Sequence, residues 1–300
     1  MAAGILLVDK PGGITSHDVV ARARRALGTR KIGHAGTLDP MATGLLVLGV
    51  DGATRLLTFI VGLDKTYETT IRLGVATDSD DADGEITRTT DAAHLTEAQI
   101  AEAIAPLTGR IAQVPSRVSA IKVGGRRAYD LARAGEEVEL AAREVTVSRF
   151  DVLAVRPGSG AAPAGGFVDL DVVVDCSSGT YIRALARDLG DALEVGGHLT
   201  ALRRTRIGPF SVAGAASVDA LADASALSPA AVAAAVLGRI DVTADEARDL
   251  RHGKRLAGAA SRLPAERCAA IDPDGRLVGI VEKRGADVKS AMNMPEEAAG

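Results

Sequence analysis

The sequence has few aromatic residues and only two cysteines. Phe, Tyr and Trp make up 2% of its 300 residues, and Trp is absent. Because 47% of the residues are nevertheless hydrophobic, the core must consist of Val, Leu, Ile and Ala, in a chain long enough for one large or two modest domains. Cys176 and Cys268 match no CxxC spacing, which predicts free thiols in a reducing cytosol rather than a disulfide.

Signatures of metal binding, secretion and membrane insertion are also missing. The five histidines form no HExxH pair, so we expect no bound metal. The apolar stretch 4–8 runs directly into Asp9 and Lys10, which makes it too short and wrongly flanked for a signal peptide. The apolar window 44–63 is interrupted by Asp51 and Arg55. These features predict a cytoplasmic protein that does not enter a membrane.

The net charge of −4 is unevenly distributed along the chain. Residues 76–102 contain eight acidic side chains and one arginine, whereas residues 117–133 contain five basic side chains and one aspartate. Local patches rather than the total charge set the field that a polyanion meets, so a nucleic-acid substrate is compatible with this composition. The acidic run 78–84 is no EF-hand, because Thr90 stands where that loop needs a bidentate Glu.

Local patterns predict both strands and helices. Apolar runs and polar-apolar alternation predict strands at residues 5–9, 45–48, 67–73 and 168–174. Thr15 and Asp18 form an approximate capping box that starts a helix, which Gly28 ends. The turn Asp272-Pro273-Asp274-Gly275 lies between two apolar runs and predicts a hairpin.

Two later segments have helical character. The Ala-rich stretch 212–237 favours a helix, and residues 181–189 predict another that stops at Gly190. Arg183 and Arg187 share one face of this second helix, where no acidic residue of the helix is positioned to pair with them. Their partners must therefore come from elsewhere in the chain.

The most informative segment is Gly33-His34-Ala35-Gly36-Thr37-Leu38-Asp39-Pro40-Met41-Ala42-Thr43-Gly44. It holds a single carboxylate, that of Asp39, in a glycine-rich loop where Pro40 favours an extended conformation for the residue before it. Asp-Pro among Gly and Thr is also an ordinary turn signature. The segment alone therefore leaves both a catalytic aspartate and a turn residue open.

Six separated motifs together resemble those of one enzyme family, the bacterial TruB-type tRNA pseudouridine synthases. They follow the family order across residues 4–210. The motifs are the Asp39 segment, Asp9-Lys10-Pro11-Gly12-Gly13-Ile14-Thr15-Ser16, Asp64-Lys65-Thr66-Tyr67, Pro115-Ser116-Arg117-Val118-Ser119-Ala120-Ile121-Lys122, Cys176-Ser177-Ser178-Gly179-Thr180-Tyr181-Ile182-Arg183 and Leu202-Arg203-Arg204-Thr205.

The resemblance implies a fold, a domain organisation and an activity. The expected fold is the mixed α/β (α+β) pseudouridine synthase fold, in which helices flank a largely antiparallel sheet. The catalytic domain would span residues 1–238, a small β-rich PUA-like RNA-binding domain 239–291 and a flexible tail 292–300. The expected activity is isomerisation of uridine 55 in the tRNA T-loop to pseudouridine. We expect a monomer that binds the T-arm and uses neither cofactor nor metal.

The resemblance also implies roles for individual residues. Asp39 would be the catalytic aspartate, Arg183 the cation that keeps it ionised, and Tyr67 the residue that stacks on the flipped uracil and relays the C5 proton. For substrate binding, His34 would fill the gap left by the extruded uridine, Leu202 would form an apolar wall behind the base, and Tyr181 would support the pocket. Phosphate contacts would come from Lys10, Lys65, Lys122, Arg126 and Arg127.

The chemistry leaves some of these assignments open. A carboxylate at position 39 could attack C1′, attack C6 or remove a sugar proton, and the sequence does not choose among the three. A non-catalytic tRNA-binding or RNA-folding module would need the same basic residues without a reactive Asp39. A glycosidase or nucleoside phosphorylase would need a second carboxylic acid or a phosphate site, and no clear motif supplies either.

Overall fold

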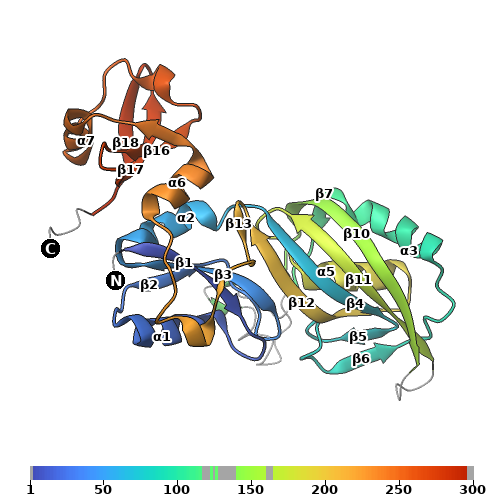
Figure 1. The fold of residues 1–300 in the computed structure, drawn as a ribbon. Coiled ribbons are helices and arrows are strands. Elements are labelled where there is room, and N and C mark those ends of the chain that lie inside the picture. Colours follow the sequence, from blue (N-terminus) through green and yellow to red (C-terminus); the bar gives the residue numbers. More distant parts are fainter. Residues whose placement is uncertain (1–2, 117–121, 124–125, 128–139, 160–164, 296–300) are drawn as a thin grey trace. The chain divides into compact units, whose positions relative to one another are not determined.

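The computed structural model describes residues 3–116, 122–123, 126–127, 140–159 and 165–295 (Figure 1). The chain divides into two compact units. Unit 1 comprises residues 1–40, 44–62 and 208–300, and unit 2 comprises residues 41–43 and 63–207. Among the helices of the described residues, none is both long and apolar enough to cross a membrane.

Unit 1 contains two separate sheets and their helices. Its elements are β1 (Gly4–Lys10), α1 (Ser16–Leu27), β2 (Ile32–Ala35), β3 (Thr43–Val50), the 3-10 turn η1 (Asp51–Leu56), α2 (Leu57–Ile60), β13 (Phe210–Ser211), β14 (Ala216–Ser217), η3 (Val218–Ala220), α6 (Pro229–Leu237), β15 (Arg239–Asp241), α7 (Ala244–Arg251), η4 (Ala260–Arg262), β16 (Arg267–Ile271), β17 (Leu277–Arg284) and β18 (Asp287–Asn293).

The first sheet of unit 1 forms around β1 and β3. Strand β3 pairs antiparallel with both β1 and β2, and β14 pairs in parallel with β1. Helix α1 packs its apolar face, which includes Val19, Val20 and Ala23, against this sheet. The predicted capping box is confirmed: the Thr15 hydroxyl accepts from the Asp18 amide, the Asp18 carboxylate accepts from the Thr15 amide, and Gly28 ends the helix at φ 66°.

The second sheet of unit 1 has the order β15-β16-β17-β18. The predicted hairpin is confirmed as β16 and β17, because the Asp272 carboxylate accepts from the amides of Asp274 and Arg276 within the turn. The predicted boundary of the flexible tail at residue 292 was too early, because strand β18 extends to Asn293. Residues 296–300 lie outside the described residues.

The Ala-rich stretch 212–237 is helical only near its end, so the prediction of a continuous helix was wrong. Helix α6 begins at Pro229, and the Ser228 hydroxyl caps it by accepting from the Ala231 amide. Proline is tolerated in the first turn of a helix but interrupts its interior, so the helix cannot extend back through this position. The preceding residues form β14, η3 and turns.

Unit 2 is built on an antiparallel sheet of order β12-β4-β11-β10-β7 (Figure 1). Its elements are β4 (Lys65–Leu73), β5 (Val75–Thr77), β6 (Ile86–Thr89), α3 (Glu97–Ile104), η2 (Ala105–Leu107), β7 (Gly109–Gln113), β8 (Lys122–Val123), β9 (Arg126–Arg127), β10 (Arg143–Ser159), β11 (Gly166–Cys176), α5 (Ile182–Ala192) and β12 (Gly197–Ile207).

The alternation predicted for β4 is confirmed, since Tyr67, Thr69, Ile71 and Leu73 are all buried on one face. Helix α5 continues beyond Gly190 rather than stopping there. A Cβ at Gly190 would lie 2.1 Å from the Gly197 nitrogen of β12, so this glycine permits a close helix-strand approach. Gly190, which was expected to end the helix, instead allows the helix to pack against β12.

Candidate active site

Asp39 lies half-buried in the unit 1 loop between β2 and β3. Both residues that flank it are held by residues at or just before the start of α1. The Ser16 hydroxyl donates to the Leu38 carbonyl at 3.1 Å and accepts from the Leu38 amide at 2.9 Å. On the other side, the Gly13 amide donates to the Pro40 carbonyl at 2.9 Å. The backbone on each side of the carboxylate is therefore fixed by hydrogen bonds within unit 1.

Lys10 belongs to this support rather than to a phosphate site. Its side chain is completely buried, and the ammonium donates to the carbonyls of Pro11, Ile14 and Pro40 at 2.9, 2.7 and 3.2 Å. A buried ammonium with its donors used in this way is compensated by the backbone and turned away from water. The expected phosphate contact of Lys10 is therefore corrected to an anchor for the Asp39 loop.

Substitution of Lys10 with Met should expose this structural role. We expect the free energy of unfolding to fall by about 1–3 kcal/mol, because buried carbonyls lose a charged donor. In contrast, the salt dependence of RNA binding should not change, whereas loss of a phosphate contact would reduce its slope by about one counterion. Urea unfolding and RNA titrations at several salt concentrations check both points. A reduced slope with unchanged stability would restore the phosphate contact.

His34 lies half-buried on β2, and its ring meets that of His17 from α1 edge to face, with 5.4 Å between the ring centroids. His17 is the second residue of α1 and is exposed. His17 was not predicted as a site residue, because a single histidine in the first turn of a helix forms no recognisable sequence pattern.

Tyr67 and Leu202 lie on adjacent strands of unit 2. Tyr67 is opposite Val174 and Arg204 in the registers of β4 with β11 and β12, and Leu202 is opposite Thr69. Both Tyr67 and Leu202 are buried. Residues diagonal to one another on neighbouring strands are within reach of an aromatic side chain, so the ring and the apolar side chain can line one surface.

Lys65, at the start of β4, is also buried. Its ammonium donates to the Leu63 carbonyl at 2.6 Å. Burial, followed by the charge of Arg204, lowers the pKa of Lys65 to about 8. A buried lysine with this environment does not offer the exposed positive charge that a phosphate contact needs, so this second expectation is corrected as well.

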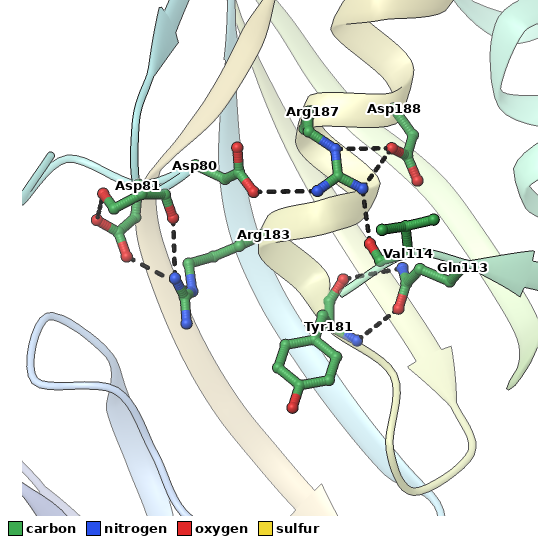
Figure 2. A network of polar contacts seen from close by, with 9 residues as sticks. Asp80, Asp81, Gln113, Val114, Tyr181, Arg183, Arg187 and Asp188 are labelled. Atoms are coloured by element: carbon green, nitrogen blue, oxygen red, sulfur yellow. Dashed lines mark hydrogen bonds and ion pairs between the residues drawn. The ribbon is translucent and has the colours of Figure 1, made fainter. Parts of the chain in front are cut away.

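Arg183 is the second residue of α5 and is almost fully buried. Its Nε lies 3.5 Å from Asp81 Oδ2, and its Nη1 donates to the Ser79 carbonyl at 2.8 Å (Figure 2). The other Asp81 oxygen, Oδ1, accepts from the Ser79 hydroxyl at 2.6 Å and from the Asp83 amide at 3.1 Å. The acidic run therefore supplies the partner that the sequence required but did not locate.

Tyr181 is the residue immediately before α5. The Gln113 side chain holds both of its backbone groups: the amide donates to the Tyr181 carbonyl at 3.0 Å, and the Gln113 oxygen accepts from the Tyr181 amide at 2.8 Å (Figure 2). The end of β7 thereby fixes the beginning of α5. Gln113 was not singled out from the sequence, since a glutamine at a strand end has no distinctive pattern.

The remaining predicted phosphate contacts fall in a part of the chain of which only short pieces are described. The backbone of Lys122 and Val123 pairs antiparallel with that of Arg126 and Arg127. The side chains of Lys122, Arg126 and Arg127 lie outside the described residues. Of the other predicted residues, Asp39, His34 and Lys10 belong to unit 1, and Tyr67, Arg183, Tyr181, Leu202 and Lys65 belong to unit 2.

Three family models together cover most of the chain. The N-terminal domain of the TruB family pseudouridylate synthases matches residues 24–182, which is more than half of the sequence. The tRNA pseudouridylate synthase B C-terminal domain matches residues 183–240, and the C-terminal model of tRNA pseudouridine synthase II matches residues 237–295. The chain belongs to the TruB family. It is therefore a pseudouridine synthase, an isomerase.

Individual relatives agree with the family models. The chain is 57% identical over 302 residues to a protein named tRNA pseudouridine synthase B from Leifsonia xyli subsp. xyli, with 99% of the chain and 98% of the relative covered. It is 58% identical over 285 residues to the protein of the same name from Nocardia farcinica, with 94% and 90% covered.

Solved structures support the fold. A chain from the structure of an H/ACA RNP bound to a substrate RNA containing 2′-deoxyuridine matches with a TM-score of 0.71 at 23% identity, covering 98% of this chain and 86% of that one. The expected mixed α/β pseudouridine synthase fold is confirmed.

Proposed function

We propose that the chain converts uridine 55 in the T-loop of tRNA to pseudouridine, with Asp39 as the catalytic residue. The observation that carries the proposal is the loop of Asp39, where hydrogen bonds to Leu38 and Pro40 fix the backbone on both sides of the carboxylate. Membership of the TruB family and relatives named tRNA pseudouridine synthase B support the choice of tRNA.

The reaction needs no oxidant, reductant or cofactor. The bond between C1′ and N1 breaks, the uracil turns, and C1′ bonds to C5. The proton on C5 leaves and N1 gains a proton, so atoms and electrons balance. Attack of Asp39 on C1′, attack on C6 and removal of a sugar proton share one requirement, which is an ionised carboxylate against the nucleoside.

Residues of unit 2 complete the proposal. The guanidinium of Arg183 favours the ionised form of the catalytic carboxylate, because a permanent cation opposes the rise in pKa that a dehydrated pocket causes. The ring of Tyr67 stacks on the extruded uracil and relays the C5 proton, Leu202 forms the apolar wall behind the base, and Tyr181 supports the pocket.

RNA contacts outside the reacting nucleoside position the substrate. In this proposal His34 fills the space that the extruded uridine leaves in the loop. Lys122, Arg126 and Arg127 contact phosphates, and residues 239–291 act as a PUA-like RNA-binding domain. The shape of the T-arm provides most of its recognition. The protein acts as a monomer in the cytoplasm.

Tritium release tests the proposal. A tRNA transcript carrying uridine tritiated at C5 should lose one tritium per molecule to water when incubated with the protein, because C5 must lose its hydrogen to bond C1′. A transcript with cytidine at position 55 is the matched control and should release none. Unchanged release from the control would place the reaction at another uridine. Binding of both transcripts without any release would favour the alternative of a non-catalytic tRNA-binding module.

A further inference from the structure

The guanidinium of Arg187 connects three parts of unit 2 (Figure 2). Its Nη1 lies 3.4 Å from Asp80 Oδ2, in the loop after β5, and its Nη2 donates to the Val114 carbonyl at 2.7 Å, directly after β7. Nε and Nη2 also donate to Asp188 Oδ1 at 2.9 and 2.7 Å, on its own helix, so the expectation that no acidic residue of this helix pairs with Arg187 was wrong. A planar fork with several donors can make these contacts at once, whereas a lysine ammonium cannot.

Asp80 has an unfavourable backbone conformation that needs support. Its φ is 61°, in the left-handed region that non-glycine residues seldom adopt, although Asp tolerates it better than most. The Leu199 amide of β12 donates to the Asp80 carbonyl at 3.1 Å. Burial raises the pKa of the Asp80 carboxyl, and the charges of Arg187 and Arg183 oppose that rise. The Arg187 cation therefore helps to keep Asp80 ionised and in place.

The loop that contains Asp80 contacts both Arg183 and Arg187, which lie on one face of α5. Ser79 and Asp81 contact Arg183, and Asp80, between them, contacts Arg187. The left-handed turn at Asp80 sets the direction in which the next residue, Asp81, leaves the backbone. A change of φ at Asp80 would move the Asp81 carboxylate away from the Arg183 guanidinium.

The contact of Arg187 with the Val114 carbonyl also supports the start of α5. Val114 directly follows Gln113, whose side chain holds the backbone amide and carbonyl of Tyr181. Arg187 thus holds the residue next to each group that fixes the start of α5: Asp80 beside Asp81, and Val114 beside Gln113. Arg183 lies between these supports, two residues after Tyr181.

We propose that Arg187 is a positioning residue for Arg183, because it holds Asp80 in the turn that directs Asp81 onto the Arg183 guanidinium. This inference rests on the proposed function, in which Arg183 takes part in the isomerisation. Arg187 touches no substrate in this account. Arg187 acts on the position of Arg183 through Asp80 and Asp81. Combined substitutions of these residues can therefore test the inference.

The test compares single-turnover rates of tritium release at saturating enzyme, together with tRNA affinity and thermal unfolding. For Arg187→Gln we expect the rate of the folded enzyme to fall roughly tenfold, with unchanged affinity, as for loss of a positioning contact. Arg187→Lys should recover part of this loss, since it keeps a charge for Asp80 but cannot also hold Val114. Arg110→Gln, which breaks the exposed Arg110–Glu144 ion pair, is the control and should match the wild type.

A double-mutant cycle distinguishes positioning from general stabilisation. If Arg187 acts through Asp81, adding Arg187→Gln to Asp81→Asn should slow the reaction no further than Asp81→Asn alone. Fold-reductions that multiply in the double variant would overturn the inference, as would a wild-type rate for Arg187→Gln. If Arg187→Gln does not fold, Asp80→Asn replaces it in the same cycle with the same expected and contradicting outcomes.

Failure of this inference and failure of the proposed function give different results. A wild-type protein that releases tritium while Arg187→Gln releases it equally fast contradicts only the role of Arg187. A wild-type protein that releases none from any tRNA contradicts the proposed function itself.

Discussion

Replacement of Asp39 with Asn should abolish pseudouridine formation while leaving the loop intact. Asn has nearly the same shape as Asp but is neither a nucleophile nor a general base at neutral pH, so we expect the single-turnover rate to fall by at least about 10³-fold. The loop should persist, because the Ser16 hydroxyl and the Gly13 amide hold the backbone of Leu38 and Pro40 on either side of residue 39. Tritium release from C5-labelled tRNA measures the rate.

Two controls make the Asp39 result interpretable. Asp39→Ala should still bind tRNA with an affinity close to that of the wild type, which shows that the loss lies in chemistry rather than in recognition. Asp219→Asn, at a carboxylate of the same unit whose side chain is 96% exposed, should react at the wild-type rate. Normal turnover in Asp39→Asn would mean that Asp39 is only the turn residue that an Asp-Pro sequence commonly indicates.

Arg183→Lys should reduce the rate by about 10²-fold, although the charge is conserved. Arg183 uses Nε toward Asp81 and Nη1 toward the Ser79 carbonyl, a divergent pair of contacts that a single ammonium cannot reproduce. In the proposed function, the new cation would therefore support the ionised carboxylate less well than the guanidinium does. The measurement is the single-turnover rate of the folded fraction, with thermal unfolding measured in parallel.

The stability measurement matters for Arg183 because removal of one partner of a buried ion pair costs about 3–5 kcal/mol. Arg183→Met is therefore expected to unfold at much lower temperature and is unsuitable for kinetics. Arg183→Lys keeps a partner for Asp81 and should remain folded. A folded Arg183→Lys enzyme with the wild-type rate would remove the electrostatic role of Arg183 from the mechanism.

Much of the fold follows from short-range patterns. The alternation in β4, the capping box of Thr15 and Asp18 and the hairpin turn at Asp272 were predicted correctly, because each depends on residues within a few positions of one another. Gly190 was misread for the opposite reason. Only the close approach of Gly197, seven positions later and on another element, shows that the glycine serves packing rather than termination.

The candidate site was predicted less completely than the fold. The sequence gives no indication whether a lysine in a motif faces water or the interior, so Lys10 and Lys65 were both assigned to phosphates although both are buried. Likewise, the need of Arg183 and Arg187 for acidic partners was evident, but Asp80 and Asp81 lie about a hundred residues earlier. Pairing over that distance is set by tertiary structure.

The double hydrogen bond between Ser16 and Leu38 has a thermodynamic consequence for substrate binding. Because Ser16 is the first residue of α1, folding of the helix and ordering of the Asp39 loop occur together. The conformational entropy of the loop is then lost when the protein folds and not when RNA arrives. On this basis the heat capacity and entropy of tRNA binding should report changes in the RNA and its solvent, with little contribution from the Asp39 loop.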